Sequence, residues 1–353
     1  MTDLRQAWNV PSRPRPIVVI GAGAIVQTAH LPAYRRLALP VAGLFDLRGD
    51  TAVETASRFD VPRVFETLDA ACADGHRMNA VFDVAVPGSA VLPVLRCLPR
   101  GAPVLIQKPM GEDLDGARAI LQTCRERELI AAINFQLRFS PNILALQDLC
   151  TRGVLGEIVD IEVRLQVRQP WESWSFFRNA PRLEVLYHSI HYLDTIRMLV
   201  GEPAGVYCRA VAHPQLRDFS DTRSTTILDY GDRLRCSLTL NHTHRYGWTH
   251  RTSMLKVEGT KGAGILSMGV NLEYPTGAPD TMEVTADGQW NAVPLRGSWF
   301  TEAFEGPMSN LQRFVAGEDP ALVSPVDDAI KTMAVVEACY ESSSAGGTPV
   351  PRP

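Results

Sequence analysis

Residues 15–32 read Arg15-Pro-Ile-Val-Val-Ile-Gly-Ala-Gly-Ala-Ile-Val-Gln-Thr-Ala-His-Leu-Pro32, and this stretch decides how the first half of the chain folds. Ile17 to Ile20 form a short apolar, β-branched run, as a buried parallel strand requires. A glycine pair follows at once, and residues 24–31 then have the composition of a helix. A strand, a glycine turn and a helix in succession predict a site for a dinucleotide.

Each position of the predicted turn has a physical reason. Gly21 permits the tight turn, and Gly23 lets the backbone approach a pyrophosphate. The free N–H groups at the start of the helix, near Ala24 and Ile25, then face the phosphate charge. The third position of G-x-G-x-x-G is Val26 rather than glycine, so the motif alone also fits an ordinary turn.

The composition is that of a globular protein with enough residues for two domains. The chain has 353 residues, of which 45% are hydrophobic and 21% charged. The net charge is −4 and no basic block is present, so we expect no nucleic-acid partner. A small molecule is the expected partner.

Several features indicate a cytoplasmic protein. No apolar run approaches the ~20 residues that span a bilayer, so we expect no membrane partner. The first fifteen residues contain no hydrophobic signal core. The seven cysteines are odd in number and include no Cys-x-x-Cys pair, which favours reduced, mostly buried thiols.

Asp46 is the candidate ribose-binding acid. It ends the predicted second strand, residues 41–45, about 20 residues past the glycines, where such an acid belongs. A carboxylate there accepts hydrogen bonds from both ribose hydroxyls and repels a 2′-phosphate, which favours NAD over NADP. Arg48 argues in the other direction, because an arginine can bind a 2′-phosphate. Asp46 also fits a turn or helix-cap residue.

The remaining pattern of residues 16–137 predicts an α/β domain, a Rossmann doubly wound parallel sheet of six strands. Ligands bind at the carboxyl ends of such strands, so Pro87 and Gln107 are expected to line the cofactor. Asp113 is expected to cap a helix. The strands after the first two are expected at residues 64–66, 81–86, 104–106 and 129–135.

Residues 138–341 predict an α+β domain with a large open antiparallel sheet, because several segments alternate with period two. Helices are expected at 184–200 and 326–340, residues 1–15 as an arm, and residues 342–353 as a loose tail. The open sheet needs cover, so a homodimer or homotetramer through it is expected. The strands are expected at residues 158–168, 224–230, 234–244 and 252–258.

Two places carry residues suited to acid–base chemistry. Lys108, where a strand meets the expected crevice, can donate a hydrogen bond to a substrate oxygen or exchange a proton; the alternative is a solvated lysine. On the later helix, Tyr187, His191 and Asp194 share one stripe, which suits a base with an orienting shell. His188 and His191 also have a metal-ligand spacing without an evident third ligand, so no metal is expected. A helical histidine can equally be a core residue.

The chain resembles the Gfo/Idh/MocA oxidoreductases, a family that includes glucose–fructose oxidoreductase and inositol dehydrogenases. The matching motifs cover roughly residues 16–200, in the family's order and spacing. They are Gly21-Ala-Gly-Ala-Ile with His30-Leu-Pro-Ala, Gln107-Lys-Pro, Phe135-Gln-Leu-Arg138-Phe and His191-Tyr-Leu-Asp194.

The resemblance implies NAD(P)-dependent oxidation of a sugar, polyol or related hydroxy compound. It implies that Lys108 is the lysine of the Glu-Lys-Pro motif and that His191 is the histidine of Asp-x-x-x-His. Two positions depart from these motifs: Gln107 replaces the glutamate, and Tyr187 replaces the aspartate four residues before His191. The loss of that acid removes one orienting group of the base, so Tyr187 is a candidate for the proton route.

Further residues are candidates for substrate contact: Arg138, Trp171, Arg178 and His188. Trp171 and Arg178 belong to an aromatic and arginine-rich segment that fits either a cover over a sugar ring or carboxylate, or a subunit interface. The histidines at 242, 244 and 250, together with Trp248, share a face if their strand is unbroken, at the cleft or an oligomer contact.

Three functions fit these features. The first is an NAD(P)-dependent dehydrogenase of a sugar, polyol or sugar acid. The second is an oxidoisomerase or lyase that uses tightly held NAD without net redox change. The third is a protein that senses a dinucleotide or sugar without catalysis, and the presence of both Lys108 and His191 argues against it.

Overall fold

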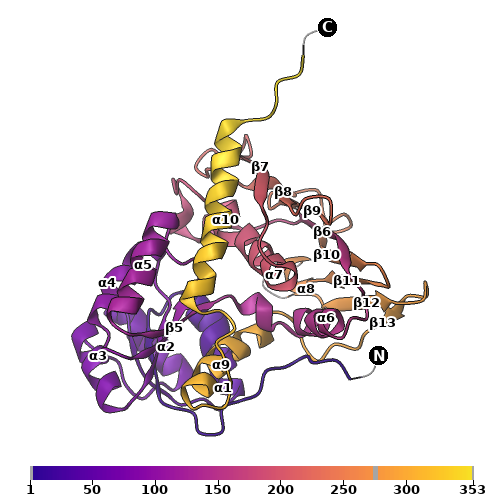
Figure 1. Ribbon diagram of the computed structural model, residues 1–353. Helices are drawn as coiled ribbons and strands as arrows, with labels where there is room; N and C mark the ends of the chain where they lie inside the picture. Colours follow the sequence, from indigo (N-terminus) through magenta and orange to yellow (C-terminus); the bar gives the residue numbers. More distant parts are fainter. Residues whose placement is uncertain (1–2, 273–276, 352–353) are drawn as a thin grey trace. The chain divides into compact units, whose positions relative to one another are not determined.

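The computed structural model describes residues 3–272 and 277–351, which form two compact units (Figure 1). The parallel-sheet unit contains Arg5–Leu144 and Ser298–Met333. The large-sheet unit contains Met1–Leu4, Ala145–Gly297 and Ala334–Pro353. Among the described residues, no helix is both long and apolar enough to cross a bilayer.

The parallel-sheet unit is built on five parallel strands in the order β2-β1-β3-β4-β5. β1 lies between β2 and β3, so the strand order reverses at β1, and a crevice for a ligand opens at such a point. Every residue of β1, β3 and β4 is buried. The strands are β1 (Ile17–Ile20), β2 (Val41–Phe45), β3 (Val81–Val84), β4 (Pro103–Gln107) and β5 (Ile130–Asn134).

The predicted strand at residues 64–66 is wrong. Val64 forms a single bridge with Leu44 beside β2. The ladder stops there because Thr67 already caps the next helix, its hydroxyl accepting a hydrogen bond from Ala70 N at 3.1 Å. The sheet therefore has five strands rather than six.

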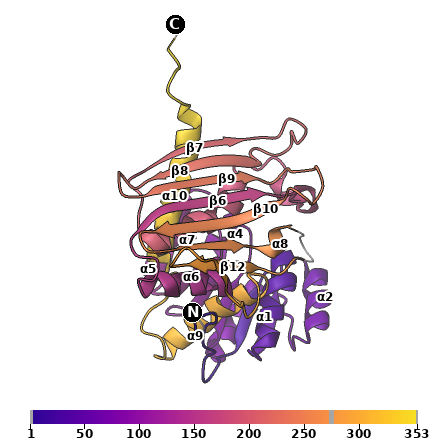
Figure 2. The ribbon, with the colours of Figure 1, turned by 90° about the vertical axis from the view of Figure 1, so that its right-hand side faces the viewer.

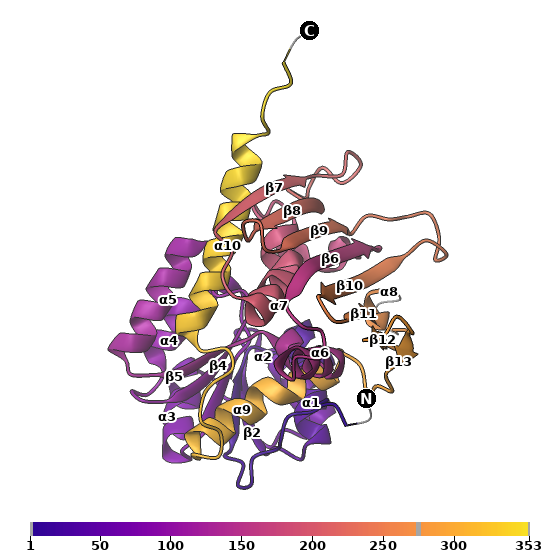
Figure 3. The same cartoon turned by 45° about the vertical axis from the view of Figure 1, so that its right-hand side comes forward.

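Helices cover both faces of the parallel sheet. α3, α4 and α5 lie along one face, and α1 and α9 along the other (Figures 1 and 3). Asp113 caps α5 as predicted, accepting a hydrogen bond from Gly116 N at 2.7 Å. The helices are η1 (Val26–His30), α1 (Leu31–Arg36), α2 (Gly49–Phe59), α3 (Leu68–Arg77), α4 (Gly88–Cys97), α5 (Leu114–Glu126), η2 (Gln136–Phe139), η6 (Glu302–Phe304) and α9 (Glu305–Val315).

Residues 298–333 belong to this unit, although the sequence-based division places them in the second domain. Phe304, Met308 and Leu311 are buried in the same apolar cluster as β1 and α1. This packing assigns α9 to the parallel-sheet unit. The period-two pattern that marks the second domain carries no information about which sheet a later helix packs against.

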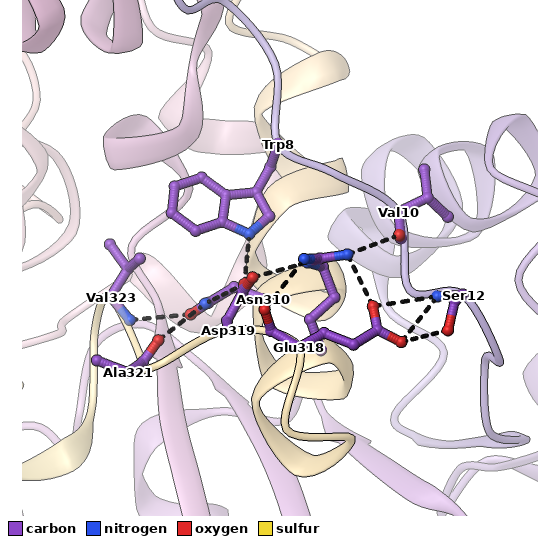
Figure 4. A network of polar contacts seen from close by, with 9 residues as sticks. Trp8, Val10, Ser12, Asn310, Glu318, Asp319, Ala321 and Val323 are labelled. Atoms are coloured by element: carbon purple, nitrogen blue, oxygen red, sulfur yellow. Dashed lines mark hydrogen bonds and ion pairs between the residues drawn. The ribbon is translucent and has the colours of Figure 1, made fainter.

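The N-terminal arm is bound to this unit by polar contacts (Figure 4). The Trp8 indole donates a hydrogen bond to Asp319 Oδ2 at 2.9 Å, and Ser12 N donates to Glu318 Oε1 at 3.1 Å. Arg313 joins the two acids, with Nε 2.8 Å from Asp319 and Nη1 2.7 Å from Glu318. Burial raises the pKa of Asp319, but hydrogen bonds from Asn310, Trp8 and Arg313 outweigh it and lower the pKa overall.

The large-sheet unit contains eight strands in the order β13-β12-β11-β10-β6-β9-β8-β7 (Figure 2). The predicted antiparallel sheet is present, with one exception: β6 and β9 run parallel. The exception arises because β6 inserts between β10 and β9. The strands are β6 (Ile158–Gln166), β7 (Gly205–Val211), β8 (Arg223–Asp229), β9 (Arg235–Asn241), β10 (Thr252–Gly259), β11 (Ala263–Ser267), β12 (Thr281–Thr285) and β13 (Asn291–Ala292).

The C-terminal residues are more ordered than predicted. The last helix continues to Ala345, past the expected start of the loose tail. Ser342 Oγ accepts a hydrogen bond from Cys208 N at 2.8 Å, and Ser343 Oγ accepts one from Ala210 N at 3.0 Å, which attaches this part of the helix to β7. The other helices are α6 (Pro141–Thr151), η3 (Trp171–Ser173), η4 (Ser175–Phe177), η5 (Val185–Ser189), α7 (Ile190–Val200), α8 (Gly269–Leu272) and α10 (Val326–Ala345).

The two glycines of the turn should respond differently to alanine. Gly21→Ala places a methyl group 2.3 Å from the Ala85 carbonyl oxygen at a φ of +105°, so we expect a loss of about 2 kcal/mol or more in unfolding free energy. Gly23→Ala meets no atom within 4 Å and should change it by less than about 0.5 kcal/mol. Urea unfolding of both variants measures the difference, and equal losses would contradict this account of the turn.

Candidate active site

The glycine loop lies between the ends of three strands. Gly21 N donates a hydrogen bond to the Phe45 carbonyl at 2.7 Å, and the Gly21 Cα faces the Ala85 carbonyl so closely that a Cβ would clash. By contrast, the space above Gly23 is open. The loop is therefore fixed on its inner side and accessible on its outer side, as a backbone that cradles a phosphate must be.

The helix after the loop begins at Ala24 and Ile25, as predicted. The Gly23 carbonyl accepts hydrogen bonds from Val26 N at 3.0 Å and Gln27 N at 3.2 Å, which closes the first turn. Residues 26–30 then form a π-helical turn before α1 begins. The N–H groups of Ala24 and Ile25 precede these bonds and form a positive site for an anion at the helix start.

Asp46 is held by backbone N–H groups at the end of β2. Its Oδ2 accepts from Ala22 N at 2.7 Å, and its Oδ1 accepts from Arg48 N at 2.8 Å. The Arg48 side chain is 71% exposed, and its Nε lies 3.9 Å from Asp46. Asp46 is thus a turn residue that also presents a fixed negative charge next to the glycine loop.

The carboxyl ends of β3 and β4 lie at the same edge of the sheet and carry Pro87, Gln107 and Lys108. Pro87 is the N-cap residue of α4, and Gln107 ends β4, 8% exposed. Among the described residues, Gln107 Oε1 is buried and has no hydrogen-bond partner, which marks a polar atom that a ligand can satisfy. Burial lowers the pKa of Lys108 to about 8, so its amine can exchange protons near neutral pH.

These features fit a dinucleotide. The open space above Gly23 leaves room for a pyrophosphate. The Asp46 carboxylate lies beside the loop, where it would face the ribose of such a ligand. The buried Gln107 Oε1 could accept a hydrogen bond from the ligand. The residues that would hold the dinucleotide are Gly21, Gly23, Ala24, Ile25, Asp46, Pro87 and Gln107.

A buried polar network ties the helix after the loop to the sheet. His30 Nδ1 lies 2.8 Å from Asp83 Oδ2 of β3, and the Tyr34 hydroxyl donates to the same oxygen at 2.8 Å. Asn134 Nδ2 of β5 lies 3.2 Å from His30 Nε2. His30 is therefore a structural residue of the parallel-sheet unit, which explains its place in the His-Leu-Pro motif.

Arg138 has a structural position rather than a place in a ligand site. It is 4% exposed, and it donates to the Val323 carbonyl at 2.7 Å and to Asp328 at 2.7 Å. These contacts hold residues 323–328 beside the end of β5. The sequence-based expectation that Arg138 contacts substrate stays a prediction, and its described contacts are structural.

The histidine helix of the large-sheet unit is not a regular α-helix. Residues 185–189 form a π-helical turn, and the α-helix begins at Ile190. Tyr187 lies in this wider turn and packs against Phe177, with the ring centroids 4.8 Å apart. Asp194 is 1% exposed and lies 3.8 Å from Arg197. π-helical turns are frequent at functional sites, and this one carries both Tyr187 and His188.

The predicted aromatic and arginine cover has a different arrangement. Trp171 is fully buried, so its ring has no free face for a sugar. Arg182 forms a double contact with Glu337, at 2.7 and 2.6 Å. Arg178 remains half exposed, with Nη1 2.9 Å from Asp218. These residues shape the segment before the helix, and Trp171 is buried within it.

The structure brings together a second pair of polar residues that the sequence did not indicate. His242 lies directly after β9, its ring 4.4 Å from the ring of His188, and Trp171 packs 4.7 Å from His188. Glu184, which is not exposed, has Oε1 3.3 Å from His242 Nε2 and 2.8 Å from the donating Ser189 hydroxyl. β9 ends at Asn241, so the predicted continuous histidine face does not form.

Asp221 is a second buried acid, at the start of the histidine helix. It accepts hydrogen bonds from Leu183 N at 2.8 Å and Glu184 N at 3.0 Å, and so fixes the start of the histidine helix. Burial, together with the charge of Glu184, raises the pKa of Asp221 above its ordinary value. The polar centre of the large-sheet unit therefore consists of Glu184 beside His242, the neighbouring His188, and Asp221 at the start of the histidine helix. Among the described residues, no group of three or more His, Cys, Asp or Glu side chains is placed to bind a metal.

Two models of one protein family match most of the chain. Residues 15–135 match the NAD-binding Rossmann fold of the Gfo/Idh/MocA oxidoreductases, and residues 147–351 match the family's C-terminal alpha/beta domain. The chain belongs to the Gfo/Idh/MocA family. The family resemblance inferred from the motifs is thereby confirmed, and the chain is an NAD(P)-dependent oxidoreductase.

Several named oxidoreductases are similar to this chain in sequence or structure. A D-apiose dehydrogenase of Rhizobium rhizogenes is 24% identical over 261 residues, 70% of this chain and 71% of that protein. A D-xylose 1-dehydrogenase (NADP+) of Haloferax volcanii is 22% identical over 333 residues, 93% of this chain and 97% of that protein. An Agrobacterium radiobacter oxidoreductase, crystallised with NAD+, L-tartaric acid and magnesium, has the same fold, with a TM-score of 0.80 and 19% identity; the match covers 94% of this chain and 97% of that one.

The lowered pKa of Lys108 can be measured directly, because the chain has only four lysines. Competitive acetylation followed by mass spectrometry should give a midpoint near pH 8 for Lys108. Lys256 should react only at higher pH, because its ion pair with Glu258 raises its pKa. A Lys108 midpoint at or above that of Lys256 would contradict the burial of the amine.

Proposed function

We propose that this protein is a dehydrogenase that prefers NAD and oxidises a hydroxyl group of a sugar, polyol or sugar acid. The names of its relatives support this substrate class, since they are dehydrogenases of D-apiose and D-xylose. The observation that carries the proposal is the position of Lys108, whose amine follows β4 at the same sheet edge as the glycine loop. Its pKa of about 8 suits proton exchange with an alcohol oxygen.

In this proposal, Lys108 and His191 share one bound hydroxyl. His191 accepts the hydroxyl proton, and the ammonium group of Lys108 donates a hydrogen bond that stabilises the developing negative charge on oxygen. A bound nicotinamide supplies the hydride acceptor. The chain's residues orient and polarise the alcohol, because the difficult electronic step belongs to the cofactor.

Tyr187 and His188 complete the proposed site. Tyr187 stands at the position of the family aspartate, with its ring fixed by Phe177. His188 is held between Trp171 and His242, and Glu184 provides a buried carboxylate behind them. We infer that this carboxylate takes over the orienting role of the missing aspartate, one helical turn earlier in the chain.

The preference for NAD follows from Asp46. Because both of its oxygens accept backbone N–H groups, its charge is fixed beside the glycine loop and would repel a 2′-phosphate. Arg48 is largely exposed and is not held toward the loop. One relative is named for NADP(+), so the preference is a property we propose for this chain alone.

The large sheet offers a surface for self-association. Tyr207 of β7 pairs with Ile227 of β8, and these side chains are 64% and 48% exposed. Neighbouring apolar side chains on the outer face of a sheet favour burial against another copy, so we propose a homodimer or homotetramer through this face.

Substitution of the two proposed catalytic residues tests the function. Lys108→Ala and His191→Ala should each lower kcat/KM for an active sugar or polyol by about 100-fold or more, because the first removes the donor that stabilises the charge on oxygen and the second removes the proton acceptor. NADH absorbance measures turnover, and parallel reactions with NADP should show a lower kcat/KM.

Lys331→Ala and His250→Ala serve as matched controls and should keep near-normal turnover. The proposal fails if the Lys108 and His191 variants both retain normal turnover with a substrate that the unaltered protein oxidises.

A further inference from the structure

A charged pocket of about 440 Å³ lies in the large-sheet unit. Its lining side chains include three guanidinium groups, one carboxylate and one indole ring. Its lining residues are Arg168, Glu172, Arg245, Gly247, Trp248 and Arg251. All six belong to one unit.

The backbone of the pocket is fixed by contacts between its two main segments. Arg168 forms an antiparallel bridge with Thr243. On either side of this bridge, Gln169 N donates to the His242 carbonyl at 2.9 Å and His244 N donates to the Val167 carbonyl at 3.0 Å. The segments that carry Arg168 and Arg245 are therefore held together before any ligand binds, which lowers the entropic cost of binding.

One arginine of the pocket is positioned by its neighbours. The Arg251 guanidinium lies 3.7 Å from the centroid of the Trp248 ring, and its Nη1 donates to the Leu272 carbonyl at 2.7 Å. Trp248 itself is 57% exposed, which is unusual for the largest apolar side chain. A cation stacked on an exposed indole presents both a charge and a flat apolar surface.

The charges of the pocket are unbalanced. Arg168 Nη2 lies 3.8 Å from Glu172, a loose contact between two exposed side chains. Arg245 is exposed, and the described part of the chain gives it no hydrogen bond or ion pair. Three positive groups around one hollow repel each other, and an anion bound among them would relieve this repulsion.

The pocket adjoins the polar centre described above. Glu172 directly follows Trp171, whose buried ring packs against both His188 and His242. Residue 242 also begins the segment that leads to Arg245. The pocket and the histidine cluster are therefore joined through the chain: Glu172 of the pocket follows Trp171 of the cluster, and Arg245 of the pocket lies three residues after His242.

We propose that this arginine pocket binds the anionic group of a sugar-like ligand. A carboxylate or phosphate matches the planar donors of arginine, and the CH face of a sugar ring matches Trp248. That the anion belongs to the molecule oxidised by this enzyme rests on the proposed function. The pocket narrows the substrate class from any sugar or polyol to acidic or phosphorylated ones.

Calorimetric titration of the full chain with three related ligands tests the proposal. D-glucuronate, D-glucose 6-phosphate and D-glucose share a ring and differ at one substituent, so the first two separate carboxylate from phosphate. At least one anionic sugar should bind 10-fold or more tightly than D-glucose. Arg245→Gln should weaken its binding about 10-fold, and Arg168→Gln with Arg245→Gln about 100-fold, without affecting D-glucose.

Arg217→Gln is the matched control, because Arg217 lines the neighbouring hollow and its loss changes the net charge equally. The control should change the affinity less than 2-fold, and melting curves should show that every variant is folded. The proposal is overturned if neither anionic sugar binds more tightly than D-glucose, or if Arg217→Gln weakens binding as much as Arg245→Gln.

The outcomes separate this proposal from the proposed function. Turnover of neutral sugars without preferred binding of anionic ones would remove the pocket's role and leave the dehydrogenase proposal intact. Arginine-dependent binding of an anionic sugar without any turnover would establish the pocket and contradict the dehydrogenase proposal.

Discussion

The close approach of Gly21 to the Ala85 carbonyl is the constraint on which the parallel-sheet unit depends. It brings the ends of β1 and β3 together where the strand order reverses, and only glycine fits there with a positive φ. Asp46 then binds Ala22 N from the end of β2, so three strands hold one short loop. The buried contacts of His30 with Asp83 extend the same fixation to the following helix.

The large-sheet unit is organised around charge rather than around a backbone turn. Asp221 fixes the start of the histidine helix, and Glu184 stands behind His188 and His242. Placing carboxylates in a protein interior is costly unless they are paired or hydrogen-bonded. In the proposed function these carboxylates orient the histidines, in a chain where Tyr187 stands four residues before His191.

Sequence patterns predicted the features that depend on near neighbours in the chain. The glycine turn, the cap at Asp113 and the alternating strands depend on local chemistry, and all are present in the structure. The composition of residues 64–66 predicts a strand, but the next helix begins too early for pairing to continue beyond Val64. The family resemblance rests on short motifs in a fixed order, so it needs no tertiary information.

Features that arise from contacts between distant segments escaped prediction. Trp171 looked available as an aromatic cover, whereas packing against His188 and His242 buries it. The pairing of Glu184 with His242 joins residues 58 positions apart, and no local pattern indicates it. The same holds for the return of α9 to the parallel-sheet unit.

The most direct test is a crystal structure of the protein with NAD and a bound sugar or polyol. The account predicts the pyrophosphate on the backbone around Gly23, with the Lys108 amine and the His191 imidazole both within hydrogen-bond reach of a single hydroxyl group at the nicotinamide ring. Dinucleotide bound elsewhere, or a hydroxyl contacted by neither side chain, would contradict it.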